Sequence, residues 1–135
     1  MMKYLTLCIA FLIISACGNP TSDYKDATNA LDAGRGFIDA CLKGDFIKAG
    51  FYMVQDEQNK KYLAQIETQY REKGREGRQQ YREASINIAE VDEVTESMTI
   101  INYSNSYDKI GHKVKVMLQN GRWLVDFKYT FNPNL

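Results

Sequence analysis

His112 is the only histidine of the chain, and histidine is the side chain best suited to proton transfer near neutral pH. The strand register predicted for the C-terminal hairpin places it beside Tyr129, and Tyr103 lies in the preceding predicted strand. A histidine next to a tyrosine can bind a polar ligand group or pass a proton. Tyr103, His112 and Tyr129 are therefore our candidates to line a ligand-binding pocket. The alternative is that His112 only forms a polar cap at the edge of the core.

Catalysis by such a pair also needs a carboxylate, and the sequence places no acidic residue beside His112. Asp126 is predicted to point to the opposite face of the sheet, where it pairs with Lys115. Asp39 and Asp45 fall in the helical half of the domain, where an exposed face and a helix cap are their expected roles. The chain also lacks a nucleophile elbow, a phosphate-binding glycine loop and a zinc-ligand spacing. We therefore expect a protein that is not an enzyme and has no cofactor and no metal site.

Cys17 is the second residue with chemical potential, and it directly follows the apolar run of residues 4–16. A basic residue, an apolar run and a small-residue cleavage site in this order are typical of a secretory signal. The run is too short for a transmembrane helix, which needs about 20 apolar residues. The stretch ISAC resembles the lipobox of bacterial lipoproteins. This resemblance implies export, cleavage before Cys17 and lipid on its thiol, with residues 1–16 as signal peptide and residues 17–24 as lipidated tether.

The remaining cysteine and the charge balance narrow the function classes further. Removal of Cys8 with the signal and lipidation of Cys17 leave Cys41 without a partner for an intramolecular disulfide, so the core must be held by packing. Cys41 falls at an apolar helix position, where a small buried hydrophobic residue is expected. The chain has 17 basic and 17 acidic residues, a balance that argues against nucleic acid as a partner.

The periodicity of apolar residues predicts helices first and strands afterwards. Spacings of three and four indicate a helix ending near Gly44, a short helix beginning after Asp45, and a third helix from Asp56. Residues 71–83 mix arginine, lysine and glutamate with two glycines. They suggest either a mobile basic segment that engages an anionic partner or, as we favour, the frayed and solvated end of the third helix. Alternation then predicts a strand at residues 84–88 and another at residues 98–103.

Asn120-Gly121 predicts a two-residue hairpin turn between the last two strands. If Gln119 pairs with Arg122, one face of the hairpin is apolar. Its predicted pairs are Leu118 with Trp123, Val116 with Val125, Val114 with Phe127, His112 with Tyr129 and Ile110 with Phe131. A slip of one residue would turn every one of these side chains to the wrong face, so the register is well determined.

The resulting fold class is α+β, with about three N-terminal helices packed on one face of a bent antiparallel sheet of about four strands. The segments RGFIDACLKGDFIKAGFYM and GRWLVDF resemble the opening helices and the closing strand of small bacterial lipoproteins of the nuclear transport factor two-like superfamily. This resemblance implies a single cone-shaped domain over residues 25–135, with a cavity at its open end. The superfamily includes isomerase-like and dehydratase-like enzymes, the latter with a His–Asp pair, and also many non-enzymes, so the fold does not decide the function.

We therefore expect a lipoprotein of the cell envelope that binds a small apolar ligand or a protein partner. The alternatives are an isomerase-like or dehydratase-like enzyme in the cavity, and a structural or assembly subunit that forms a homodimer through the sheet. The lipid on Cys17 supplies the contact with the membrane. Gly18 replaces the aspartate associated with inner-membrane retention, which favours the outer membrane if the source is Gram-negative.

Substitution Cys17→Ser is expected to abolish lipid attachment, because the thiol is the acceptor. The measurement is incorporation of a labelled fatty acid during expression in a bacterial host, with the mass of the purified protein as a second readout. The matched control Cys8→Ser should be lipidated normally. Fatty-acid incorporation that persists in the Cys17→Ser protein would contradict the lipobox interpretation.

Overall fold

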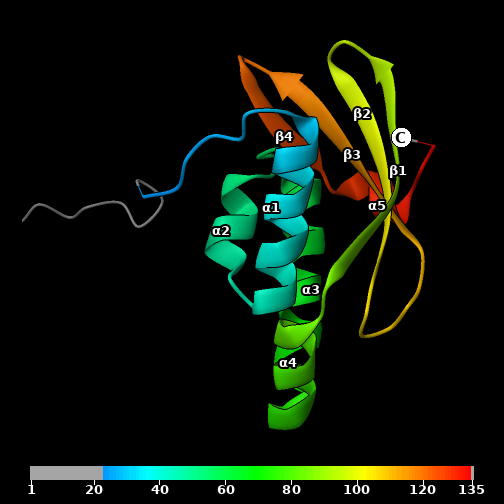
Figure 1. The fold of residues 1–135 in the computed structure, drawn as a ribbon. Helices are drawn as coiled ribbons and strands as arrows, with labels where there is room; N and C mark the ends of the chain where they lie inside the picture. The colour runs from blue at the N-terminus through cyan, green and yellow to red at the C-terminus, as the bar shows by residue number, and fades with distance from the viewer. Residues whose placement is uncertain (1–22, 135) are drawn as a thin grey trace, which may run out of the picture.

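The computed structural model describes residues 23–134 and has an α+β architecture with a four-stranded antiparallel sheet, as the sequence predicted. The sheet order is β1-β2-β3-β4. The elements are α1 (Ala30–Lys43), α2 (Phe46–Phe51), α3 (Glu57–Glu72), α4 (Gly74–Glu83), β1 (Ile86–Thr95), β2 (Met98–Asn105), β3 (His112–Gln119), β4 (Arg122–Asp126) and α5 (Lys128–Phe131). Helices α1 to α4 lie on one side of the sheet (Figure 1). The predicted signal peptide and Cys17 lie outside the described residues, and none of the described helices has the length and apolar character of a membrane span.

Helix α1 ends and α2 begins where the sequence predicted, because both helices are capped locally. Asn29 begins α1 by accepting a hydrogen bond from the backbone N–H of Asp32 at 2.8 Å. Gly44 ends α1 in the left-handed conformation (φ 73°), which glycine adopts without steric cost. Asp45 then caps α2 by accepting from the N–H of Lys48 at 3.0 Å.

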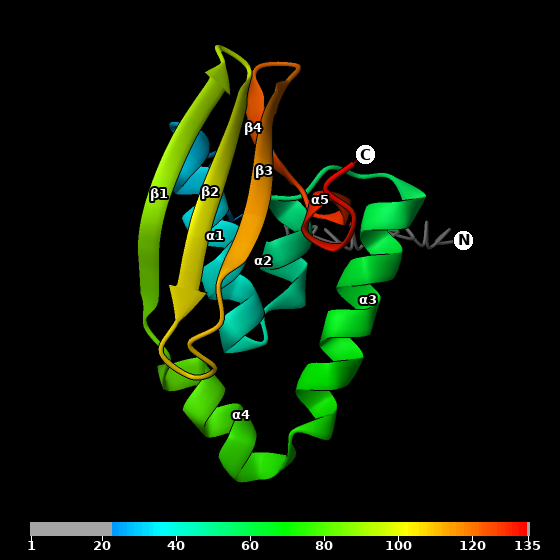
Figure 2. The ribbon, with the colours of Figure 1, turned by 90° about the vertical axis from the view of Figure 1, so that its right-hand side faces the viewer.

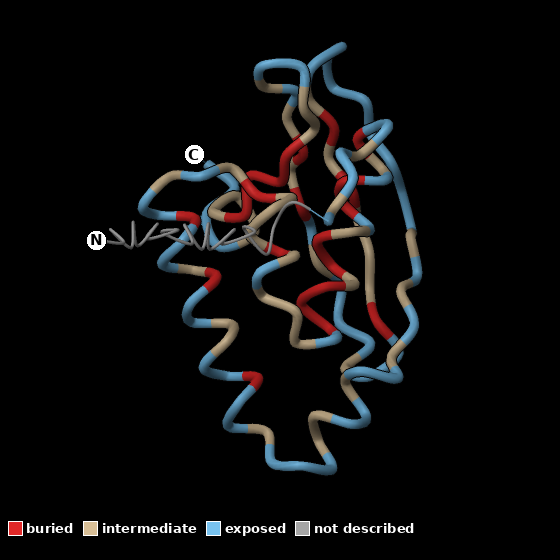
Figure 3. Tube along the Cα trace, turned by 90° about the vertical axis from the view of Figure 1, so that its left-hand side faces the viewer, coloured by how far each residue is buried: buried red, intermediate tan, exposed pale blue. Residues whose placement is uncertain are grey.

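The hydrophobic core lies between α1, α2 and the inner face of the sheet (Figure 3). Phe37, Val114, Val116 and Val125 are at most 2% exposed there. Gly34 lets α1 approach the sheet closely, since a Cβ at this position would lie 2.5 Å from the Ile101 side chain. The first half of the domain therefore packs tightly on the strands.

Helices α3 and α4 form an arm that leaves this core and returns to the start of β1 (Figure 2). Gly74 (φ 67°) breaks the helix between them, and α4 then begins, so four helices rather than about three precede the sheet in the described chain. The favoured prediction of a frayed end at residues 71–83 is wrong, although none of the residues of α4 is buried. Arg82 holds α4 against α3 by donating to the Tyr70 hydroxyl at 3.0 Å. We call α3 and α4 together the helical arm.

The Asn120-Gly121 turn is confirmed, and so is the predicted register from the turn to the pair Lys115–Asp126. Both residues have positive φ (51° and 76°), as a type I′ turn requires. The observed pairs include Gln119 with Arg122, Leu118 with Trp123, Val116 with Val125 and Lys115 with Asp126. The strand predicted at residues 84–88 is also observed, but as β1 it begins at Ile86 and continues to Thr95. The second half of β1 is polar and exposed, and it remains a strand because its backbone pairs with β2.

The predicted pairs beyond Asp126 are wrong: Val114 does not pair with Phe127, His112 with Tyr129 or Ile110 with Phe131. Strand β4 ends at Asp126, Phe127 adopts a helical conformation (φ −68°, ψ −28°) and α5 begins at Lys128. His112 pairs instead with Tyr103 of β2. The cause is Asn59 of α3, whose side-chain oxygen accepts from the Lys128 backbone N–H at 2.6 Å and so removes that donor from the ladder.

A buried polar cluster joins the start of α3 to this corner. Asn59 is fully buried and Asp126 is 3% exposed. The Asp126 carboxylate accepts from Asn59 Nδ2 at 3.0 Å and from the ammonium groups of Lys128 (2.7 Å) and Lys115 (3.1 Å). Asp56 adds a second carboxylate, which accepts from Lys128 Nζ at 2.9 Å and from the Asn59 N–H at 2.7 Å. We call these five residues the corner cluster.

The electrostatics of the corner cluster favour its charged form. Burial of Asp126 opposes ionisation, but the hydrogen bonds from Lys128, Asn59 and Lys115 outweigh it and hold the pKa of this carboxyl below its usual range. For Lys128, burial opposes the charge, whereas the hydrogen bonds to Asp126 and Asp56 raise its pKa. The contribution of Asp126 to stability is therefore present above the pKa of an unfolded aspartate, about 3.9, and is lost as the pH falls through the lower folded value.

Substitution Asn59→Ala should lower the free energy of unfolding by about 2–3 kcal/mol, since it removes one partner of the buried Asp126 and leaves the partly buried Lys128 N–H without its acceptor. Urea unfolding followed by circular dichroism measures this loss. Asn87→Ala, at an exposed position of β1, is the matched control and should stay within about 0.5 kcal/mol of the wild type. Equal stabilities of the two variants would contradict the structural role of the corner cluster.

Candidate functional site

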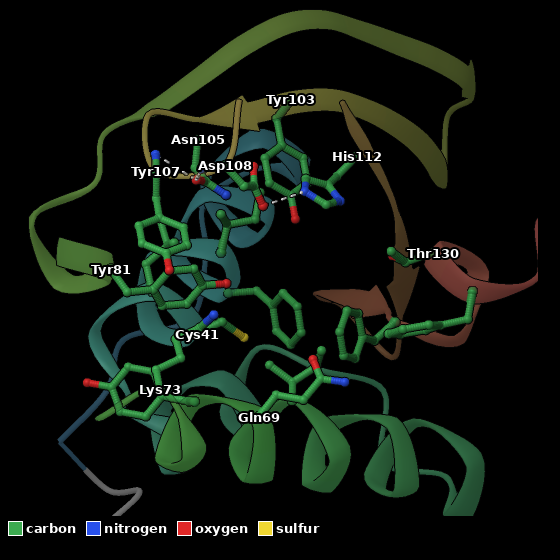
Figure 4. Close-up of a pocket in the computed structure, with 17 residues that line it drawn as sticks. Cys41, Gln69, Lys73, Tyr81, Tyr103, Asn105, Tyr107, Asp108, His112 and Thr130 are labelled. Atoms are coloured by element: carbon green, nitrogen blue, oxygen red, sulfur yellow. Dashed lines mark hydrogen bonds and ion pairs between the residues drawn. The ribbon is translucent and has the colours of Figure 1, made fainter. Parts of the chain in front are cut away.

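A cavity of about 290 Å³ lies between α1, the helical arm, the end of β2 and the start of β3 (Figure 4). Its inner wall is apolar and comes mainly from α1 and the β4–α5 corner. The apolar lining residues are Phe37, Ile38, Cys41, Leu42, Ile66, Phe127 and Phe131. The first half of α3 is joined to the sheet by the corner cluster and by the Tyr62–Phe131 stack, whose ring centroids are 4.2 Å apart. The second half of α3 diverges from the strands, and this divergence leaves room for the cavity.

Two of the three predicted site residues meet at the rim of this cavity. Tyr103 and His112 are paired neighbours on β2 and β3, and their ring centroids are 5.4 Å apart. Both line the cavity. Tyr129 does not join them, because it lies on α5 with its ring under the Lys115 ammonium, 5.2 Å from Nζ. Its neighbours Thr130 and Phe131 line the cavity instead.

Asp108 is the acidic residue that sequence analysis missed. It lies in the loop between β2 and β3, with its Oδ2 3.4 Å from His112 Nε2 (Figure 4). Asn105 shapes this loop by accepting from the backbone N–H groups of Tyr107 (3.0 Å) and Asp108 (3.1 Å). An asparagine with this turn-forming role was the one local pattern that pointed to a structured loop. The register error left Asp108 unnoticed, because His112 was sought beside Tyr129.

Asp108 is an acceptor rather than an acid at neutral pH. Partial burial opposes its ionisation, but hydrogen bonds from the Ile110 N–H and from His112 hold the pKa of this carboxyl below its usual range. The carboxylate therefore orients the His112 ring and leaves Nδ1 as the second polar atom of that ring. This pair occupies the upper edge of the cavity in Figure 4.

Tyrosine hydroxyls supply neutral hydrogen-bond donors. Burial raises the pKa of Tyr81 to about 12 and that of Tyr103 further, so both stay protonated at physiological pH. Neither hydroxyl makes a hydrogen bond to another residue of the described range, and no side-chain polar atom within that range is both buried and unpaired. The two hydroxyls are therefore accessible to a molecule in the cavity.

Lys73 closes the rim at the corner of the helical arm. Its Nζ lies 4.9 Å from the ring centroid of Tyr81 and 5.0 Å from that of Tyr107, a cation–π arrangement that spans α4 and the β2–β3 loop. Within residues 23–134, no carboxylate forms an ion pair with it. The rim thus carries one cation, one histidine–carboxylate pair and several phenols around an apolar interior.

This arrangement suits an amphipathic small molecule. The volume is near the lower end of the roughly 300–1,000 Å³ typical of ligand pockets, and apolar walls with a few polar groups are their usual composition. The part of the chain that the structure describes holds no group of three or more histidine, cysteine, aspartate or glutamate residues arranged to bind a metal ion.

Comparisons of the chain with protein-family models, with curated proteins and with solved structures find no match.

Proposed function

We propose that this protein is an exported, lipid-anchored module of the bacterial cell envelope whose cavity binds a small and largely apolar ligand. The observation that carries the proposal is the cavity itself, which apolar side chains such as Phe37, Ile38 and Ile66 line. In a purely structural subunit, the arm would be expected to pack tightly against α1 and to leave no cavity. The ligand-binding role also agrees with the cone-shaped superfamily that the sequence resembles.

The lipobox supports attachment to a membrane through Cys17. Five residues lie between Cys17 and Asp23, where the described domain begins, and a fully extended chain over these six Cα–Cα steps reaches about 20 Å. The tether would therefore hold the cavity close to the membrane surface, where apolar molecules of the envelope are concentrated. The outer membrane is the favoured location for a Gram-negative source.

The experiment uses 1-octanol as a neutral probe of the cavity and Cys41 as the reporter. Cys41 lines the cavity, is 9% exposed, and burial raises the pKa of its thiol to about 12, so it should react slowly with N-ethylmaleimide. Octanol should slow this reaction further by filling the cavity and should raise the unfolding midpoint by several degrees near saturation. Mass spectrometry of the tryptic peptide of residues 36–43 isolates Cys41 from the other cysteines of the full chain.

The control is Ile66→Phe, which places a larger side chain on the arm face of the cavity. This variant should fold normally and lose the effect of octanol on both the labelling rate and the midpoint. If octanol alters neither quantity in the wild-type protein, the cavity does not take up apolar molecules and the proposed function is wrong.

An acid–base enzyme is the second candidate, and the Asp108–His112 pair favours it. His112 oriented by a carboxylate could remove a proton α to a carbonyl, while the Tyr103 hydroxyl donates to the carbonyl oxygen. The pair is partly solvent-exposed, with side chains 26% and 30% accessible, and its 3.4 Å separation makes a weak hydrogen bond. We therefore rank binding without catalysis first.

The two candidates differ in their effect on 2-octanone dissolved in D₂O. An enzyme would exchange the α-protons of the ketone for deuterium faster than buffer alone, and His112→Ala would remove that acceleration. A binding module would leave the exchange at the buffer rate. Proton NMR of the ketone measures the exchange, and acceleration that disappears in the His112→Ala protein would replace the binding proposal by the enzymatic one.

A further inference from the structure

We infer that the ligand of the cavity is a small amphipathic carboxylate whose charged end binds Lys73 and whose apolar body occupies the wall formed by α1 and Phe127. This inference rests on the proposed ligand-binding function. It adds the charge and the approximate size of the ligand.

The polar groups at the rim are mainly donors. Tyr81 and Tyr103 offer protonated hydroxyls with no partner in the described part of the chain, and the Lys73 ammonium offers three N–H groups. The acceptor that faces them, Asp108, is already engaged by His112 and by the Ile110 N–H. A ligand group with several acceptor oxygens therefore complements this rim better than a donor does.

The charge of the rim selects an anion over a cation. A ligand cation would favour the faces of the tyrosine rings, but Lys73 already lies over Tyr81 and Tyr107. The Asp108 charge is balanced locally by hydrogen bonds, whereas Lys73 has no carboxylate partner among residues 23–134. A carboxylate would give Lys73 a charge-assisted hydrogen bond, which is about twice as strong as a neutral one.

The volume sets the size of the apolar body. A space of 290 Å³ holds about ten groups of the size of a water molecule, each about 30 Å³. Octanoate has ten non-hydrogen atoms and carries its carboxylate at one end. It is therefore a suitable probe for this class of ligand.

The test compares three probes that share one alkyl chain: octanoate, 1-octanol and octylamine. Dissociation constants for the full chain follow from the unfolding midpoint and from the rate of Cys41 labelling at increasing probe concentration. At neutral pH the wild-type protein should bind octanoate about tenfold more tightly than octanol, and octylamine most weakly, a tenfold ratio being about 1.4 kcal/mol.

Variants of Lys73 identify the origin of this preference. Lys73→Gln should reduce the ratio of octanol to octanoate dissociation constants to about one. Lys73→Arg keeps the charge and should retain the preference. Lys61→Gln, at an exposed position of α3 outside the cavity lining, is the matched control and should behave like the wild type.

The outcomes separate this inference from the function on which it rests. Equal binding of octanol and octanoate, or tightest binding of octylamine, would overturn the carboxylate inference and leave the binding function standing. A preference for octanoate that survives in the Lys73→Gln protein would overturn the role of Lys73. Failure of all three probes to bind would overturn the proposed function, and the inference would fall with it.

Discussion

The buried carboxylate of Asp126 is the constraint on which the architecture of this protein depends. A charge 3% exposed to solvent is tolerated only when hydrogen bonds and opposite charges replace the lost water. Asn59 from α3 and the ammonium groups of Lys115 and Lys128 supply these interactions. These interactions bring the start of α3 to the end of β4, where the strand stops and α5 begins.

The cavity follows from this arrangement. One end of α3 is joined to the sheet by the corner cluster, and the arm returns to the sheet only at the start of β1. Between these two attachments the arm and α1 enclose the cavity, which apolar residues such as Ile38 and Ile66 line. The buried residues gather between α1 and the strands, where their packing stabilises the domain (Figure 3).

The chemistry of the rim is distributed over elements that are distant in the sequence. Lys73 comes from the corner of the arm, Tyr103 from β2 and Asp108 from the loop that follows. Each of these side chains is positioned by a neighbour with a structural role, such as Asn105 for Asp108 and the tyrosine rings for Lys73. The site therefore depends on the mutual placement of the arm and the sheet rather than on any single motif.

The sequence by itself determined the features that depend on near neighbours along the chain. The caps at Gly44 and Asp45, the Asn120-Gly121 turn and the hairpin register next to this turn were all predicted, because their geometry depends on interactions across a few residues. Tertiary structure alone decided where β4 ends, that the helical arm forms one wall of the cavity, and that His112 lies next to Asp108. Asn59 and Asp126 are 67 positions apart, and no local pattern announces a hydrogen bond over that separation. The same Asn59 side chain accepts from the Lys128 N–H, and so it ended the strand pattern that would have paired His112 with Tyr129.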